Sequence, residues 1–258
     1  MERGALSLPE LRRPELSLVV PIYDEGETLA RTLARLTKAL ERTGLEFEIV
    51  GVDDGSRDDS AQVLNGMARR DPRVVALRNQ KNEGKGSAVQ KGVLAARGRW
   101  IATLDADLST DLEALPQGLE LLRGGAAVVL GDRHRPGAEV LVRQPRLREF
   151  CGRVFSCLGR LLIAPSVSDF TCGFKAFRRD AARTIFSGLE TPGWAFDLEV
   201  VAVAHSRGLS IAPLPVRWSH RAATRVRLPG DAWRALVDLL RIATHYRAGL
   251  YREGRGAP

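Results

Sequence analysis

Short apolar runs alternate with longer helical patterns through the first half of the 258-residue chain. Runs rich in Val, Ile and Leu predict buried strands, whereas apolar residues three or four positions apart predict helices. Strands that alternate with helices of ten or more residues indicate an α/β fold whose mainly parallel sheet is covered on both faces. The expected strands are residues 16–24, 47–56, 73–80, 99–107 and 126–133, and the expected helices are 26–44, 58–72, 84–98 and 112–125.

The alternation becomes looser after Arg133, where strands are shorter and helices follow one another. We expect one domain with a specialised C-terminal third, preceded by an extension over residues 1–15. The α/β domain is predicted to span residues 16–229, and residues 230–258 to form an amphipathic basic helix and tail. Within the C-terminal third, the pattern predicts helices over 147–164, 194–208 and 230–253, a loop, strand and helix over 169–186, and an extended segment over 209–221.

Polar clusters follow four of the predicted strands. Ligands of an open parallel sheet bind beyond the carboxyl ends of its strands. Each cluster alone could serve as a turn or a helix cap, but four clusters at the same end of successive strands favour a common ligand site. They are residues 23–25, 53–56, 82–86 and 105–107.

Two carboxylates, Asp105 and Asp107, stand one residue apart at the end of an apolar run. Residues i and i+2 of an extended chain point the same way. Neighbouring carboxylates repel each other unless a cation lies between them. Mg²⁺ or Mn²⁺, with oxygen ligands and a phosphate-bearing substrate, would remove that repulsion. The pair therefore predicts a metal–diphosphate site.

Several common sites are excluded by their missing motifs. No G-x-G-x-x-G follows the first predicted strand, and residues 84–88 lack both the upstream Gly and the Ser/Thr after Lys of a phosphate-binding P-loop. No G-x-S-x-G nucleophile elbow occurs. The four His are scattered without the spacing of zinc ligands.

Charge and cysteine content add two expectations. The net charge of +8 is concentrated in residues 143–258, which hold 19 Lys and Arg against 9 Asp and Glu. Such an excess favours an anionic partner, although a solvated basic face has the same composition. The N-terminus lacks the apolar stretch of a signal peptide, no run approaches about 18 uncharged apolar residues, and the three Cys lack metal-ligand spacing. We therefore expect a cytoplasmic protein with reduced thiols.

Four segments resemble the family-2 inverting glycosyltransferases of the GT-A fold: residues 19–29, 52–60, 82–92 and 104–110. The resemblance continues at 131–133, 169–179 and 194–201, and these later motifs are similar to the polyprenyl-phosphate (dolichyl-phosphate) sugar synthases, with the glucosyltransferase branch closest. It implies a single GT-A domain that moves a hexose from a nucleotide-diphosphate sugar, of the UDP-glucose or GDP-mannose type, to a polyprenyl or dolichyl phosphate. No nucleic-acid partner is expected.

The resemblance also implies roles for individual residues. The donor's base and ribose would contact residues after the first two strands, its diphosphate would lie near Lys85, and Mg²⁺ or Mn²⁺ would be bound after the fourth strand. Ser109 stands where the mannosyl branch has a Gln of the metal shell. The implied donor-binding residues are Pro21, Tyr23, Glu25, Asp53, Asp54, Lys85, Asp105, Ala106 and Asp107, and the implied metal ligands are Asp105, Asp107 and Ser109.

The acceptor side has fewer candidates. By the same resemblance, Arg133, Arg148 and Arg221 would hold the acceptor phosphate, and Gly152 replaces a Ser of the relatives. Asp107 is the main catalytic candidate. An anionic phosphate needs no strong base, whereas a hydroxyl acceptor would need one within hydrogen-bond reach. Asp169, Asp197 and Glu199 are the candidates for that base, and Asp197 can instead be an N-terminal helix charge.

Three functions remain open from the sequence. The first is a polyprenyl-phosphate glycosyltransferase at the membrane surface. The second is a soluble glycosyltransferase of the same fold that modifies a small-molecule hydroxyl, and the third, which the acidic pair disfavours, is a non-catalytic nucleotide-sugar-binding protein. The basic helix from residue 230 either packs on the domain or lies on an anionic membrane as a peripheral contact at its cytoplasmic face.

Overall fold

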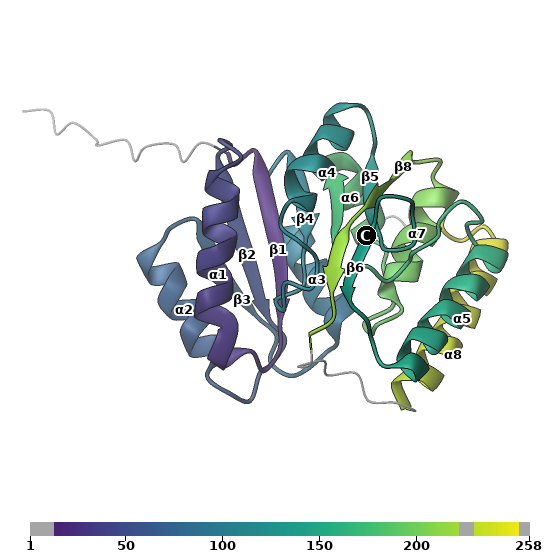
Figure 1. The fold of residues 1–258 in the computed structure, drawn as a ribbon, viewed down its shortest axis with the longest axis horizontal. Helices are drawn as coiled ribbons and strands as arrows, with labels where there is room; N and C mark the ends of the chain where they lie inside the picture. Colours follow the sequence, from purple (N-terminus) through teal and green to yellow (C-terminus); the bar gives the residue numbers. More distant parts are fainter. Residues whose placement is uncertain (1–12, 222–229, 253–258) are drawn as a thin grey trace, which may run out of the picture.

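A seven-stranded mixed sheet forms the centre of the molecule (Figure 1). The computed structural model describes residues 13–221 and 230–252, so the expected extension over 1–15 lies almost wholly outside the described residues. The strand order is β3-β2-β1-β4-β7-β5-β8, and β7 is antiparallel to both of its neighbours. The strands are β1 (Leu16–Ile22), β2 (Phe47–Asp53), β3 (Val74–Arg78), β4 (Trp100–Thr103), β5 (Val128–Asp132), β7 (Lys175–Arg178) and β8 (Ile211–Pro215). A separate two-stranded sheet pairs β6 (Glu139–Val142) with β9 (Arg217–Ser219).

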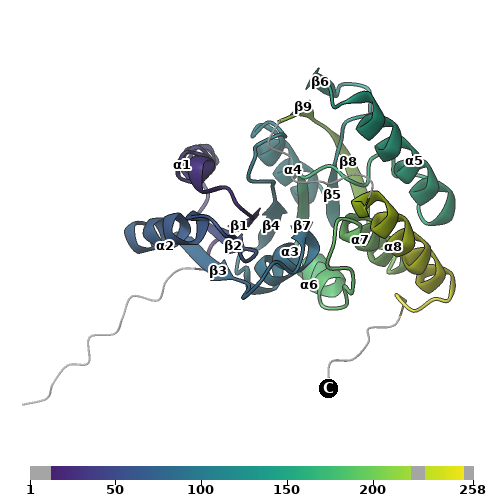
Figure 2. The same cartoon turned by 90° about the horizontal axis from the view of Figure 1, so that it is seen from below.

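Helices cover both faces of the central sheet, which confirms the predicted α/β fold (Figure 2). One face packs against α1 (Gly26–Glu41), α2 (Ser60–Arg70) and α4 (Ala114–Arg123). The other packs against α3 (Lys85–Ala95), α6 (Arg179–Phe186) and α7 (Phe196–Ser206). Beyond α7 lies α8 (Gly230–Arg247), and α5 (Arg146–Leu162) runs beside α8.

Helix α1 shows how the apolar pattern produces this packing. Leu29, Leu33, Leu36 and Leu40 lie on one side of the helix and are fully buried against the sheet. Each buried Leu contributes about 1.5–3 kcal/mol relative to an exposed one. The helix begins at Gly26, where the residues after β2 come close to the backbone. Only a residue without a side chain fits there, because a Cβ at Gly26 would lie 1.7 Å from Asp59 Oδ1.

The largest differences from the sequence-based expectation concern three elements. Strand β4 ends at Thr103 rather than at residue 107. Strand β6 was not predicted, because its four residues are all exposed and its partner strand lies far along the chain. Helix α8 ends at Arg247 rather than near residue 253, and Gly249 follows it with a φ of +74°, a conformation that Gly adopts readily.

Because β4 ends at Thr103, the expectation that Asp105 and Asp107 lie in an extended strand and point the same way is wrong. Residues 105–108 form a turn, in which the Leu108 N–H donates to the carbonyl of Asp105 at 3.1 Å, and Leu108 has a φ of +51°. The chain is therefore not extended between Asp105 and Asp107, and the alternation of an extended strand does not orient them. A left-handed Leu is uncommon, and such residues cluster at functional sites.

Helix α8 has a buried and an exposed side. Leu239, Ile242 and Ala243 belong to the same apolar core as α3, α6 and α7. Trp233, Val237 and Leu240 are exposed on the opposite side. None of the helices within the described residues is long and apolar enough to span a bilayer. The expected tail beyond residue 252 lies outside the described residues.

Candidate active site

The polar clusters after β1, β2, β3 and β4 meet at one edge of the sheet. The Asp24 N–H donates to Ser56 Oγ at 2.9 Å and joins the first cluster to the second. The Gly84 N–H donates to Asp54 at 2.9 Å and joins the third to the second. Lys85 Nζ lies 2.7 Å from Asp105 Oδ1 and joins the third to the fourth. The convergence predicted from the sequence is therefore present.

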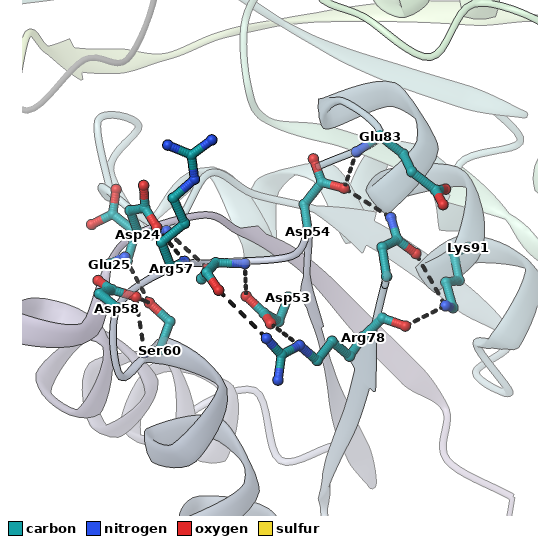
Figure 3. Close-up of polar contacts among 12 residues, drawn as sticks. Asp24, Glu25, Asp53, Asp54, Arg57, Asp58, Ser60, Arg78, Glu83 and Lys91 are labelled. Carbon is teal, nitrogen blue, oxygen red and sulfur yellow. Dashed lines mark hydrogen bonds and ion pairs between the residues drawn. The ribbon is translucent and has the colours of Figure 1, made fainter. Parts of the chain in front are cut away.

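Asp54 holds the loop that carries Lys85 (Figure 3). Its Oδ1 accepts hydrogen bonds from Asn79 Nδ2 at 2.8 Å and from the Glu83 N–H at 3.0 Å, while its Oδ2 accepts from the Gly84 N–H. Burial raises the pKa of Asp54 above its ordinary value, and these hydrogen bonds oppose that rise. The sequence did not predict this loop-holding role, and the contact with the donor's base stays a prediction.

Asp53 is fully buried and makes its contacts within the protein (Figure 3). Its Oδ1 accepts a hydrogen bond from the Ser56 N–H at 3.1 Å, and its Oδ2 lies 3.0 Å from Arg78 Nε. These contacts fix the turn after β2. The structure therefore gives Asp53 a supporting position beneath the expected donor site, and direct donor contact stays a prediction.

The remaining donor candidates at the end of β1 are Pro21, Tyr23 and Glu25, and all three are half-buried. Glu25 Oε2 accepts a hydrogen bond from Thr28 Oγ1 at 3.0 Å. Their contact with base and ribose stays a prediction, as does that of Ala106, which is buried and whose carbonyl accepts from Thr32 Oγ1 at 3.1 Å.

Lys85 sits among carboxylates and aromatic rings. Besides its ion pair with Asp105, its ammonium lies 5.3 Å from the ring centroid of Trp194 and 5.9 Å from that of Phe196. Burial would lower the pKa of Lys85, but the nearby Asp105 and Asp197 raise it above its ordinary value. Burial would likewise raise the pKa of Asp105, but Lys85 lowers it. Both groups are therefore charged at neutral pH, and contact between Lys85 and the donor's diphosphate stays a prediction.

A second buried Lys–Asp pair lies behind the first. Lys175 Nζ lies 2.6 Å from Asp197 Oδ1 and donates to the carbonyl of Cys172 at 2.6 Å. The ring centroid of Phe196 lies 5.9 Å from the ammonium of Lys175 and 5.9 Å from that of Lys85, so the same ring contacts both pairs. Sequence reasoning did not single out Lys175, the first residue of β7, whose signal is a charged residue between the buried Phe174 and Ala176.

The three candidate bases are all buried and bound to other groups. Asp197 is 2% exposed, and burial raises its pKa despite the nearby Lys175. Glu199 accepts hydrogen bonds from two backbone N–H groups of residues 190–191 and from the hydroxyl of Tyr251. Asp169 is 2% exposed and makes a bidentate ion pair with Arg133. None of these three carboxylates is exposed to an incoming hydroxyl, and the catalytic role of Asp197 stays a prediction.

Arg133 uses most of its donors on Asp169. Its Nε and Nη2 lie 2.7 and 2.8 Å from the two carboxylate oxygens, and Nη2 also donates to Thr171 Oγ1 at 2.8 Å. Its guanidinium carbon lies 5.3 Å from the ring centroid of Trp218. Burial would raise the pKa of Asp169, but Arg133 lowers it to about 2. Arg133 is thus held in place through Nε and Nη2, and its Nη1 has no hydrogen bond to another described residue.

Arg148 differs from Arg133 in having no ion pair among the described residues. It is half-buried on α5, and burial together with the charge of Arg133 lowers its pKa, whereas the charge of Asp107 opposes that shift. Arg148 therefore lies within electrostatic range of both residues. One turn later, Gly152 has open space around the position of a Cβ. Arg221 is exposed just after β9, at the end of the first described segment.

The metal candidates offer two carboxylates. Asp107 is half-buried, and its Oδ1 accepts a hydrogen bond from the Ser109 N–H at 2.8 Å. Within the described ranges, no group of three or more His, Cys, Asp or Glu could hold a metal ion. Oxygen ligands suit Mg²⁺ or Mn²⁺, and these ions commonly take the rest of their ligands from substrate phosphates and water. Metal binding by Asp105 and Asp107 stays a prediction, as does coordination by the buried Ser109.

Gly173 allows Asp105 to occupy its position. A Cβ at Gly173 would lie 2.3 Å from Asp105 Oδ2 and 2.6 Å from its Cγ. We predict that Gly173→Ala displaces the Asp105 carboxylate and lowers glycosyl transfer at least tenfold, because a 1 Å misplacement in an active site can cost about a hundredfold. Steady-state kinetics, with circular dichroism to verify the fold, measures the effect. Gly188→Ala is the matched control, since its Cβ would have nothing within 4 Å, and equal activities of the two variants would contradict the prediction.

We also predict that Asp54→Ala weakens nucleoside-diphosphate binding by about one to two decades. A charge-assisted hydrogen bond contributes about 1.5–3 kcal/mol, which corresponds to that range. Calorimetric titration with UDP and GDP measures the loss. Asn79→Ala separates two causes, because it removes one of the bonds that hold the 79–84 loop but leaves the carboxylate in place. If Asn79→Ala weakened binding as much as Asp54→Ala, the loss would come from the displaced 79–84 loop. If Asp54→Ala bound the nucleoside diphosphates with unchanged affinity, Asp54 would contribute to donor binding neither through the base nor through the loop.

Comparison with known proteins identifies the family of the chain. The model of the family "Glycosyl transferase family 2" matches residues 17–186. The chain is 36% identical over 246 residues to the dolichyl-phosphate beta-glucosyltransferase ALG5C of Trichomonas vaginalis, with 91% of this chain and 72% of the relative covered. It is 32% identical over 252 residues to the human dolichyl-phosphate beta-glucosyltransferase, with 92% and 78% covered.

A solved structure supports the fold. Glucosyl-3-phosphoglycerate synthase from Mycobacterium tuberculosis, crystallised with Mn²⁺, UDP and glucosyl-3-phosphoglycerate, superposes with a TM-score of 0.66 at 17% identity. The superposition covers 95% of this chain and 86% of that one. Both the predicted GT-A fold and the predicted resemblance are confirmed, and the chain belongs to glycosyltransferase family 2.

Proposed function

We propose that this glycosyltransferase moves a hexose, with inversion, from a UDP- or GDP-sugar to a polyprenyl or dolichyl phosphate, with Mg²⁺ or Mn²⁺ bound at Asp105 and Asp107. The relatives named dolichyl-phosphate beta-glucosyltransferases support this acceptor and favour glucose as the hexose. The single observation that carries the proposal is a contrast between Arg148 and the three candidate bases. Arg148 is half-buried near Asp107 and has no ion pair within residues 13–221 and 230–252, whereas all three candidate bases are buried and bound.

Donor binding follows from the charges at the sheet edge. Lys85 is held next to Asp105 and can contact the diphosphate, and the loop that carries it is held by Asp54. A bound divalent cation would neutralise the charge that develops on the leaving nucleoside diphosphate. The carboxylate of Asp107 would contribute a ligand on the protein side, with its orientation fixed by the Ser109 N–H.

Acceptor binding requires positive charge rather than a base. A phosphate oxygen is already anionic and can attack the anomeric carbon without losing a proton. Arg148 can pair with that phosphate, and Arg133 can contribute Nη1 from its fixed position beside Asp169. Arginine suits this task because its fork matches phosphate oxygens. These cations would also reduce the repulsion between an anionic acceptor and an anionic donor.

The test is a transfer assay with matched acceptors. The purified full chain is incubated with UDP-glucose or GDP-mannose, with Mg²⁺, Mn²⁺ or EDTA, and with either a polyprenyl phosphate or the same polyprenol without phosphate in detergent. We expect transfer only with the phosphate and only with metal, and we expect Arg148→Ala to raise the KM for the acceptor while leaving UDP affinity unchanged. Transfer to a water-soluble hydroxyl acceptor but not to the lipid phosphate would replace this proposal with the soluble glycosyltransferase.

A further inference from the structure

Residues 190–194, the segment before α7, lie directly against the turn that carries Lys85. The Ser87 N–H donates to the carbonyl of Pro192 at 3.2 Å. A Cβ at Gly84 would lie 2.4 Å from that same carbonyl oxygen. The two backbones therefore touch with no side chain between them, and any displacement of the 190–194 segment would displace Lys85 as well.

The 190–194 segment also supplies one of the groups that surround the ammonium of Lys85. Asp105 lies 2.7 Å from the ammonium, while the ring centroid of Trp194 lies 5.3 Å from it. The ring of Phe196 follows at 5.9 Å, and the Phe196 N–H donates to the carbonyl of Gly193 at 3.3 Å. The position of the ammonium therefore depends on where this segment is held.

Glu199 of α7 holds the segment from below. It is 1% exposed, and its Oε2 accepts hydrogen bonds from the Glu190 N–H at 3.1 Å and the Thr191 N–H at 2.8 Å. Its Oε1 accepts a hydrogen bond from the hydroxyl of Tyr251 at 3.0 Å. A buried carboxylate is costly unless its oxygens are hydrogen-bonded, so Glu199 links the segment to Tyr251.

Helix α8, which packs against α7, provides a second connection (Figure 2). Arg241 Nη2 donates to Thr191 Oγ1 at 3.0 Å and to Asp238 Oδ1 at 3.3 Å. Tyr251, which follows the helix, is itself fixed, because it is 7% exposed and its carbonyl accepts a hydrogen bond from Arg207 Nε. The C-terminal part of the chain therefore contacts the segment at two independent points.

We propose that α8 and Tyr251 position Lys85 for the diphosphate of the donor through the 190–194 segment. Tyr251, Glu199 and Arg241 are positioning residues, because each acts on Lys85 through the segment rather than on the donor. The inference rests on the proposed function, in which Lys85 contacts the diphosphate, and gives the C-terminal part of the chain a role in donor binding. A cation that is already held in place loses less freedom when it binds its ligand.

Tyr251→Phe tests this role, because it removes the hydroxyl that Glu199 Oε1 accepts from and keeps the ring. UDP, GDP, UMP and GMP are titrated calorimetrically into the full chain at constant Mn²⁺. We expect the affinity for the diphosphates to fall by about three- to tenfold, the size of one lost hydrogen bond. The affinity for the monophosphates should change less than about twofold, whereas a general loosening of the fold would weaken both classes.

Two further variants keep the test decisive. Arg241→Met removes the second connection and should have the same selective effect, and its 38% exposed side chain makes it a replacement should Tyr251→Phe fail to fold. Tyr246→Phe is the matched control on the same helix, since the Tyr246 hydroxyl lies 2.7 Å from His205 Nδ1 and not on the segment. It should bind UDP like wild type, and an equal loss in Tyr246→Phe would overturn the proposal.

A double-mutant cycle with Lys85 tests whether Tyr251 acts through it. Lys85→Met alone should weaken diphosphate binding at least about tenfold, and Tyr251→Phe should then cause no further loss, because residues that act through one another are not additive. Additive losses would overturn the proposal, and so would normal binding by both Tyr251→Phe and Arg241→Met, with the Lys85 contact left standing. Unchanged affinity in Lys85→Met would instead reject the diphosphate contact of the proposed function, and the positioning role with it.

Discussion

Asp107→Asn is expected to lower glycosyl transfer by at least about a hundredfold while leaving the fold intact. The change removes the negative charge of the half-buried carboxylate but keeps a similar shape. Preorganised electrostatic groups that stabilise a developing charge typically contribute about 10²–10³ in rate, and the loss should include the metal-dependent part of donor binding. Steady-state rates at increasing Mn²⁺, with calorimetric titration of UDP in the presence of Mn²⁺ or EDTA, measure both effects.

The control for this variant is Asp111→Asn, a neighbouring carboxylate on the same loop. Asp111 lies 4.0 Å from Arg217 Nη1 in a largely exposed pair and should tolerate the change with nearly normal activity. Normal turnover of Asp107→Asn in either metal would show that the site is assigned to the wrong carboxylate. An unfolded variant is recognised by its circular dichroism spectrum and would be replaced by Asp107→Ser.

Asp169→Ala is expected to reduce the free energy of unfolding by about 3–5 kcal/mol. Removing one partner of a buried ion pair leaves the other charge uncompensated, and here Arg133 would lose both of its carboxylate contacts. Urea unfolding followed by circular dichroism measures the change. Asp180→Ala is the matched control, because its pair with Arg178 is exposed and should contribute less than about 1 kcal/mol. Similar losses in both variants would contradict the prediction.

The same pair predicts a pH dependence of stability. The pKa of Asp169 is about 2 in the folded protein, below the ordinary 3.8 of an Asp. A carboxyl whose pKa is lowered by folding stabilises the protein above its unfolded pKa, and this contribution disappears as the pH falls through the folded pKa. Wild type should therefore lose more stability than Asp169→Asn between pH 4 and pH 2. If the stability of wild type and of Asp169→Asn changed equally over this pH range, the pairing with Arg133 would not lower the pKa of Asp169.

The sequence predicted helices better than it predicted strand pairing and strand ends. The spacing of Leu residues in α1 predicted a helix with one buried side, because 3.6 residues per turn is a local property of the chain. The β6–β9 pair was not predictable, because its residues are exposed and its pairing joins segments far apart in the sequence. The end of β4 was also missed, because an apolar run does not reveal where hydrogen bonding to neighbouring strands stops.

For the site, the sequence predicted where the acidic clusters lie but not what each carboxylate contacts. Their position after successive strands predicted that they meet, since parallel strands end at a common edge. What each carboxylate does depends on groups that only the folded chain brings near. Asp54 binds the loop before α3, Asp169 is occupied by Arg133, and Arg148 has no ion pair among the described residues.

By itself, the sequence determined the α/β class, the motifs of family 2, the edge of the sheet where polar residues collect, and the basic character of the C-terminal part. These properties depend on periodicity and residue type, which are local. The tertiary structure decided which charged residues are buried and paired, that Gly173 makes room for Asp105, and that α5 and α8, which are far apart in the sequence, pack side by side. These depend on contacts between distant segments, because burial and electrostatic pairing are set by neighbours in space rather than by neighbours along the chain.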